Sequence, residues 1–99
     1  MDYSDAIRRI LWYVLAGTKG GPTRVKILML LRERPYNINQ LSSTLKMDYK
    51  TILHHIKILE ENKIIYSDEK KYGTIYFISQ VINQNMQTFE EISRKIREK

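Results

Sequence analysis

The chain has 99 residues, of which 42% are hydrophobic and 28% are charged, and it contains no cysteine. These values are typical of one globular domain, and they exclude a disulfide framework, a thiolate metal site and a cysteine nucleophile. The formal net charge of +6 at pH 7 suits a polyanionic partner. The acidic start and the lack of a long apolar run predict a cytoplasmic protein with neither signal peptide nor membrane anchor.

The first half of the chain predicts two helices joined by a short linker. Apolar residues recur at helical spacing over residues 3 to 16, and Gly17 is expected to end this first helix. Gly20-Gly21-Pro22 is a linker in which proline suits the first turn of the next helix. That second helix, residues 22 to 33, is apolar on most of its circumference, so we expect it to be surrounded by protein.

A helix-turn-helix pair follows. We expect a third helix over residues 40 to 46, with Asn39 as its cap. Asp48 is then expected to cap a fourth helix that reaches about residue 62. The short turn between the two helices is what such a pair requires.

The last third of the chain predicts a hairpin and a final helix. Residues 64 to 67 and 74 to 78 are rich in residues that favour strands, and the charged segment 68 to 73 is expected to join them as a loop. Ser79 is expected to cap a fifth helix that continues to about residue 97.

This order of elements predicts a mostly α fold with a small β-hairpin. The expected architecture is a winged helix-turn-helix with extra N- and C-terminal helices, in a single domain over residues 1–99. Within it, residues 1–17 are expected to form an N-terminal dimerisation helix, residues 20–79 the winged helix-turn-helix core, and residues 80–99 a C-terminal dimerisation helix.

The fourth helix has two faces. At about 100° per residue, Lys50, His54 and Lys57 fall close together on one side. Ile52, Ile56 and Leu59 fall near the opposite side. A helix that enters a major groove needs such a polar, cationic face, although a solvated surface carries lysines too. The predicted DNA-binding residues are Tyr49, Lys50, Thr51, Leu53, His54 and Lys57 on this helix and Lys70, Lys71 and Tyr72 at the hairpin tip, for which a solvated loop is the alternative.

Several of these side chains have chemistry suited to particular contacts. Lys50 can donate to guanine, Thr51 and His54 can meet base edges or phosphates, and Leu53 can touch a thymine methyl group. Lys57 is placed to meet phosphate. His55 falls toward the apolar side, where we expect it to pack at the core edge and not to share a metal with its neighbour His54.

Segments along nearly the whole chain resemble a known family. Gly20-Gly21-Pro22-Thr23-Arg24, Asn39-Gln40-Leu41, Asp48-Tyr49-Lys50-Thr51-Ile52 and Tyr72-Gly73 are similar to archaeal regulators of the ArsR-like winged-helix group. The resemblance implies a transcription regulator whose fourth helix reads the major groove while the wing touches an adjacent minor groove or the backbone.

The chain also departs from that family. Metal-sensing members use cysteine clusters, or Asp and His ligands on the terminal helix, and this chain has neither, so no metal and no cofactor are expected. Relatives often place glycine where this chain has Lys46 and Lys63. We therefore expect these two turns to be less sharp.

The terminal helix predicts a homodimer. Ile82, Phe89 and Ile96 recur at intervals of seven, the spacing of a coiled-coil seam. The expected dimer interface comprises Ile7, Leu11, Val14, Ile82, Met86, Phe89, Ile92 and Ile96, and Trp12 is a candidate to extend it. The alternative is that this helix packs on the chain's own core. On its outer face, Glu90 with Arg94 and Glu91 with Lys95 are expected to form pairs.

These patterns favour a sequence-specific regulator over an enzyme. We expect a homodimeric repressor that binds double-stranded DNA, with half-sites about 10 to 11 base pairs apart or a multiple. Two alternatives stay open: a winged-helix protein-interaction module and a sequence-neutral architectural DNA-binding protein. No pattern identifies catalytic residues or a small-molecule effector.

Overall fold

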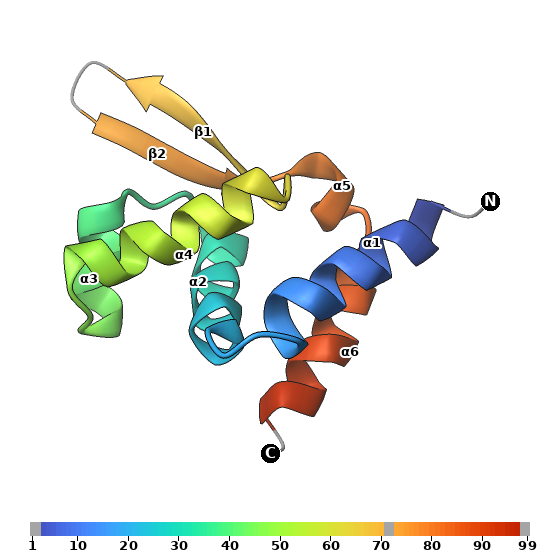
Figure 1. Cartoon of the computed structure of the whole chain (residues 1–99). Coiled ribbons are helices and arrows are strands. Elements are labelled where there is room, and N and C mark those ends of the chain that lie inside the picture. The colour runs from blue at the N-terminus through green and yellow to red at the C-terminus, as the bar shows by residue number, and fades with distance from the viewer. Residues whose placement is uncertain (1–2, 71–72, 98–99) are drawn as a thin grey trace.

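The computed structural model describes residues 3 to 97 except residues 71 and 72. The elements in chain order are α1 (Tyr3–Leu11), η1 (Trp12–Ala16), α2 (Gly21–Glu33), α3 (Ile38–Leu45), α4 (Tyr49–Glu61), β1 (Ile65–Lys70), β2 (Gly73–Ile78), α5 (Gln80–Asn83) and α6 (Met86–Arg97). Figure 1 places α3, α4 and the hairpin at one end, α1, α5 and α6 at the other, and α2 between them. The described part of the chain is thus mostly helical with a two-stranded antiparallel hairpin, which confirms the predicted fold class.

The N-terminal helix ends in a tight approach to α2. It continues from α1 into η1, a π-helical turn, and the N–H of Gly17 closes it by donating to the carbonyl of Trp12 at 2.9 Å. At the start of α2, a Cβ on Gly21 would lie 1.7 Å from the carbonyl oxygen of Leu15. Only glycine fits there, so the linker predicted from the sequence is needed for packing as well as for the turn.

The N-terminal cap of α3 differs from the expected residue, whereas the cap of α4 is the expected one. Asn37, not Asn39, caps α3: its Oδ1 accepts from the N–H of Gln40 at 2.7 Å, and the Gln40 side chain accepts from the N–H of Asn37 at 2.9 Å. The helix therefore begins two residues earlier than predicted, because this reciprocal pair satisfies two free N–H groups. Asp48 caps α4 as predicted, accepting from the N–H of Thr51 at 3.2 Å.

Two lysines adopt the backbone conformation that favours glycine. Lys46, after α3, has φ 56°, and Lys63, after α4, has φ 61°. The expectation that these turns would be less sharp without glycine is therefore wrong. The turns keep their geometry, and each lysine carries a strain of about 1 to 2 kcal/mol in it.

The hairpin is longer than predicted. β1 pairs with β2 from Ile65 opposite Ile78 to Lys70 opposite Gly73, so most of the expected loop is strand. Only residues 71 and 72 separate the two strands. The backbone groups of Tyr36 and Tyr76 bond to each other at 2.9 and 3.4 Å, which ties β2 to the segment before α3.

The terminal helix is broken, contrary to the prediction of one continuous helix. α5 ends at Asn83, and the Asn85 side chain donates to the carbonyl of Val81 at 2.8 Å before α6 begins. Ser79 stands at the cap position of α5, but its side chain makes no capping bond, and its Oγ is buried without a partner within the described part of the chain.

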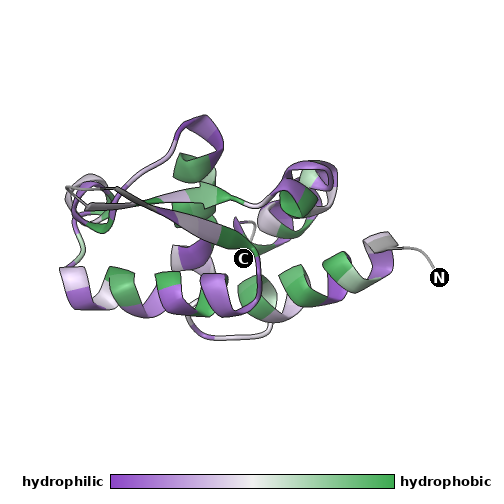
Figure 2. Cartoon of the chain, turned by 90° about the horizontal axis from the view of Figure 1, so that it is seen from above, coloured by the Kyte–Doolittle hydropathy of each residue, from purple (hydrophilic) through white to green (hydrophobic). Residues whose placement is uncertain are grey.

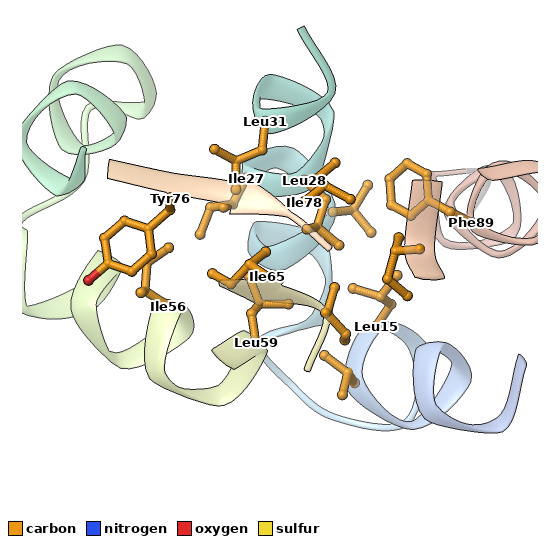
Figure 3. Close-up of a cluster of buried hydrophobic side chains, with 14 of the residues drawn as sticks. Leu15, Ile27, Leu28, Leu31, Ile56, Leu59, Ile65, Tyr76, Ile78 and Phe89 are labelled. Carbon is orange, nitrogen blue, oxygen red and sulfur yellow. The ribbon is translucent and has the colours of Figure 1, made fainter. Parts of the chain in front are cut away.

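The apolar faces of the terminal helices are covered within the chain. Figure 3 shows Phe89 directed from α6 toward the cluster that contains Leu28 and Ile78. In Figure 2, apolar and polar bands alternate along the helix that leads to the N-terminus. Six of the eight residues predicted for the dimer interface are buried here: Ile7, Leu11, Val14, Ile82, Phe89 and Ile92. Their assignment is corrected, because α1, η1 and α2 pack on α6 and leave these side chains no surface for a partner; Met86 and Ile96 stay partly exposed.

The acidic residues of α6 also have other partners than expected. Glu91 pairs with Arg8 of α1 at 3.1 Å, and Glu90 pairs with Arg32 of α2 at 2.9 Å. The predicted pairs along α6 are thus replaced by pairs between helices. Both ion pairs join α6 to the helices that cover its apolar side.

Candidate nucleic-acid interface

Helix α4 separates a buried face from an exposed one. Ile52, Ile56 and Leu59 are fully buried. Lys50, His54 and Lys57 are exposed on the other side, and we call these three residues the α4 stripe. The two faces lie as the sequence predicted. That the exposed face contacts DNA stays a prediction.

The N-terminal end of α4 borders a polar hollow. Tyr49 is exposed, whereas Thr51 and Leu53 are half-buried. Tyr49 and Leu53 line a hollow of about 320 Å³ together with Asn37, Asn39 and Thr74, none of which the sequence analysis assigned to a DNA contact. These polar side chains come from the start of α3 and from β2. Of these three, only Asn39 was assigned a role from the sequence, that of a helix cap.

The acidic residue at the start of α4 is used inside the fold. Interaction with the Thr51 side chain lowers the pKa of the Asp48 carboxyl group, and the hydrogen bond that Asp48 accepts from the Thr51 N–H lowers it further. The carboxylate thus stays charged and stabilises the positive N-terminal end of α4. This capping role explains why an acidic residue lies beside the cationic residues at the start of α4.

The wing is described only in part. Lys70 ends β1, opposite Gly73, while Lys71 and Tyr72 lie outside the described residues. On the strands themselves, Tyr66 stacks on Phe77 with ring centroids 5.1 Å apart and planes 12° apart. Tyr66 is half exposed, so the hairpin also presents an aromatic surface that the sequence analysis did not predict.

A buried arginine connects α4 with the linker before α2. Arg24 donates through Nε to the carbonyl of Val14 at 2.9 Å, through Nη2 to the hydroxyl of Thr18, and through Nη1 to Nδ1 of His55, 3.1 Å away. His55 is buried at the core edge, which confirms its predicted packing role. Arg24 was missed, because its partner His55 lies 31 residues away in the sequence.

The surroundings of His55 favour its neutral form. Burial lowers the pKa of the His55 imidazole, and the charges of Arg24 and His54 lower it further. With Nδ1 accepting from Arg24, the proton of the neutral ring lies on Nε2. The imidazole therefore acts as an acceptor that holds the guanidinium against α4.

The described residues contain neither a metal-binding cluster nor a membrane-spanning helix. No group of three or more His, Cys, Asp or Glu side chains is arranged to hold a metal ion there. The rings of His54 and His55 meet edge to face at 5.3 Å between centroids and do not converge. Within the same residues, every helix is too short or too polar to cross a membrane.

Comparisons with known proteins identify the fold. Residues 21–67 match the model of the arsR family of bacterial regulatory proteins. A search of curated proteins finds no match. Among solved structures, HlyU from Vibrio cholerae is 19% identical and has a TM-score of 0.72, with 95% of this chain and 96% of that chain covered.

Two further structures are similar over most of this chain. The homodimeric winged helix-turn-helix DNA-binding domain of Mb0332 from Mycobacterium bovis is 16% identical, with a TM-score of 0.69 and coverage of 99% and 88%. The adhesin competence repressor AdcR from Streptococcus pyogenes is 17% identical, with a TM-score of 0.63 and coverage of 95% and 69%. At these identities the likeness shows the fold alone, which is a winged helix-turn-helix.

Proposed function

We propose that this chain, which has the fold of ArsR-family transcriptional regulators, is a sequence-specific double-stranded DNA-binding regulator that acts as a homodimer. The observation that carries the proposal is the α4 stripe. Lys50, His54 and Lys57 are exposed in a line on the second helix of a helix-turn-helix, while the opposite face of that helix is fully buried. A rigidly held helix with a cationic outer face is what major-groove recognition requires.

The chemistry of the stripe divides between bases and phosphates. Lys50, in the first turn of α4, is expected to donate to guanine O6 or N7. Lys57, two turns later, is expected to meet phosphate as the helix leaves the groove. The polar hollow beside Tyr49, with Asn37 and Asn39, adds donors that can contact the backbone of the same duplex.

We place the contact between two copies on exposed aromatic residues of η1. Trp12 is 48% exposed and Tyr13 is 62% exposed, and exposed apolar side chains that gather in one patch can mark a contact with a partner. Both line a groove of about 440 Å³ between η1 and α6, and Lys95 Nζ lies 5.8 Å from the centre of the Trp12 ring. The homodimeric state of the similar Mb0332 domain supports a self-association of this kind.

We further propose that the protein acts in the cytoplasm and represses by occupying promoter DNA. The structurally similar AdcR is a repressor, which supports this sign of regulation. A two-fold dimer would present its two α4 helices to major grooves about one helical turn, or a multiple, apart. We also propose, from the resemblance of the sequence motifs, that the chain is a regulator of the archaeal type.

The experiment is a titration of promoter fragments and random duplexes of equal length at two salt concentrations. We expect the affinity for DNA to fall steeply with salt. The protein should bind the promoter fragment that contains its operator at least about 10³-fold more tightly than it binds random duplex. Equal affinity for all duplexes would instead support the sequence-neutral architectural protein. No salt-dependent binding to any duplex would support the protein-interaction module.

A further inference from the structure

A second hollow lies behind the α4 stripe, between α4 and the segment that joins η1 to α2. It has a volume of about 350 Å³, within the range of small-molecule sites. Tyr13, Val14 and Ile58 give it apolar walls. Its charged and titratable lining comprises Lys19, Arg24 and His54 and one acid, the exposed Glu61, so basic groups outnumber acidic ones. We call this hollow the Arg24 pocket.

Arg24 is a buried cation without an acidic partner. Its side chain is 2% exposed, and its three acceptors are a carbonyl, a hydroxyl and an imidazole nitrogen. The ion pairs of the described residues join Arg8 to Glu91 and Arg32 to Glu90, so neither neutralises Arg24. A buried charge without a counter-charge is costly, and buried arginines are usually paired.

The electrostatics of the guanidinium agree with this geometry. Burial lowers the pKa of Arg24, which reflects the cost of holding its charge away from water. A guanidinium also has more N–H groups than its three acceptors here can take. Arg24 can therefore still donate to a group that approaches from the pocket.

We infer that the Arg24 pocket binds a small carboxylic acid with a short apolar body, such as an aromatic or branched-chain acid. The carboxylate would accept from the guanidinium of Arg24 and face Lys19, supplying the missing negative charge. The apolar body would lie against Tyr13, Val14 and Ile58. A purely inorganic anion would leave these walls unfilled.

The pocket also connects the ligand to α4. Arg24 contacts His55, which is adjacent in sequence to His54 of the α4 stripe, and on its other side it contacts Val14 and Thr18. A carboxylate that engages the remaining N–H groups of the guanidinium would draw Arg24 toward the pocket, weaken its contact with His55 and so alter the position of α4. This regulatory half of the inference rests on the proposed function in DNA binding.

Binding is tested without DNA, by NMR titration of the labelled protein with sodium benzoate at constant ionic strength. We expect a dissociation constant on the order of 1 mM, with shifts centred on Thr18, Gly20 and His55. Benzamide, the neutral isostere, is expected to bind about tenfold more weakly or worse, because it lacks the charge-assisted hydrogen bonds. Equal binding of the two compounds, or shifts confined to other parts of the chain, would overturn the site.

Two charge reversals on exposed lysines sharpen the test without disturbing the buried arginine. Lys19→Glu, at the pocket wall, is expected to weaken benzoate binding about fivefold or more, whereas Lys26→Glu on α2 changes it less than twofold. Similar effects of both variants would mean that only the overall charge of the protein attracts benzoate, and would overturn the site.

The regulatory half is tested by adding saturating benzoate to the protein–promoter complex. We expect the affinity for DNA to change about fivefold or more, and benzamide to have no effect. Unchanged DNA affinity with a filled pocket would overturn the regulatory half alone. A protein that binds benzoate but never binds DNA would contradict the proposed function and leave the site standing.

Discussion

The two ends of the molecule in Figure 1 use their charges differently. At the end formed by α1 and α6, with α2 beside them, Arg8 and Arg32 pair with Glu91 and Glu90 and hold the helices together. At the end formed by α3, α4 and the hairpin, the exposed stripe of α4 makes no ion pair with the described part of the chain. Charge is used for packing at one end and stays available for a partner at the other.

The largest expected effect concerns the packed end. Phe89→Ala removes the largest side chain of α6 from the core of the single chain, and should cost about 3 to 5 kcal/mol in the free energy of unfolding. Urea denaturation at two protein concentrations measures it. The loss of free energy should be the same at both concentrations if Phe89 packs within its own chain. A loss that vanishes on dilution would instead support the original prediction that Phe89 lies in a dimer interface.

The matched control for this variant is Arg94→Ala, an exposed residue on the same helix. We expect its free energy of unfolding to stay within about 0.5 kcal/mol of the wild-type value. If both variants lost a comparable free energy of unfolding, α6 would be sensitive to any substitution. The effect of Phe89→Ala could then not be assigned to the burial of its side chain.

Glycine at the strained turns should stabilise the end that contains α4. Lys46→Gly and Lys63→Gly each replace a left-handed lysine, and each should raise the free energy of unfolding by up to about 1 kcal/mol. Thermal unfolding of the single and double variants checks this. A drop in the melting temperature would show that the lysine side chains contribute more than their backbone strain costs.

Removing the cap of α3 should lower stability by a similar or smaller amount. Asn37→Ala deletes the acceptor for the N–H of Gln40 and should cost about 1 kcal/mol. Asn39→Ala, the residue expected from the sequence to be the cap, is the control and should have little effect. If urea denaturation shows the reverse order, the cap assignment from the structure fails.

The smallest expected effect is a dependence of stability on pH. The folded chain holds the pKa of His55 below its unfolded value, so the unfolded chain binds more protons. Stability from this group is present above about pH 6.5 and is lost as the pH falls through the unfolded value toward the folded one. In His55→Gln, urea midpoints between pH 7.5 and 5 should depend less on pH than in the wild type; an unchanged dependence would assign it to other groups.

The sequence predicted the end that carries α4 better than the packed end, for a physical reason. The faces of α4 follow from the helical period alone, and the cap at Asp48 follows from its local sequence. Asn37 and Asn39 could both act as caps, and only the reciprocal bond with Gln40 decides between them. The lysine turns were misjudged because φ is set by the packing of the flanking elements, α3 and α4 for Lys46 and α4 and β1 for Lys63.

At the packed end the information is not local. The seven-residue spacing of Ile82, Phe89 and Ile96 correctly marked an apolar face of the terminal segment, but periodicity does not tell whether that face meets the same chain or a second copy. The burial of Arg24 depends on contacts with Val14, Thr18 and His55, which are brought together only by folding. The Arg24 pocket therefore could not be predicted from the sequence.

The most direct test of the α4 stripe is the salt dependence of promoter binding by Lys50→Ala and Lys57→Ala, with Arg94→Ala as the control at the other end of the molecule. Lys57→Ala should weaken binding to all duplexes and reduce the slope of log K against log salt by about 0.9 for each lost phosphate contact. Lys50→Ala should cost about 1 to 3 kcal/mol on the promoter and less on random duplex. Wild-type affinity and slope in both α4 variants would contradict the assignment of this helix to DNA.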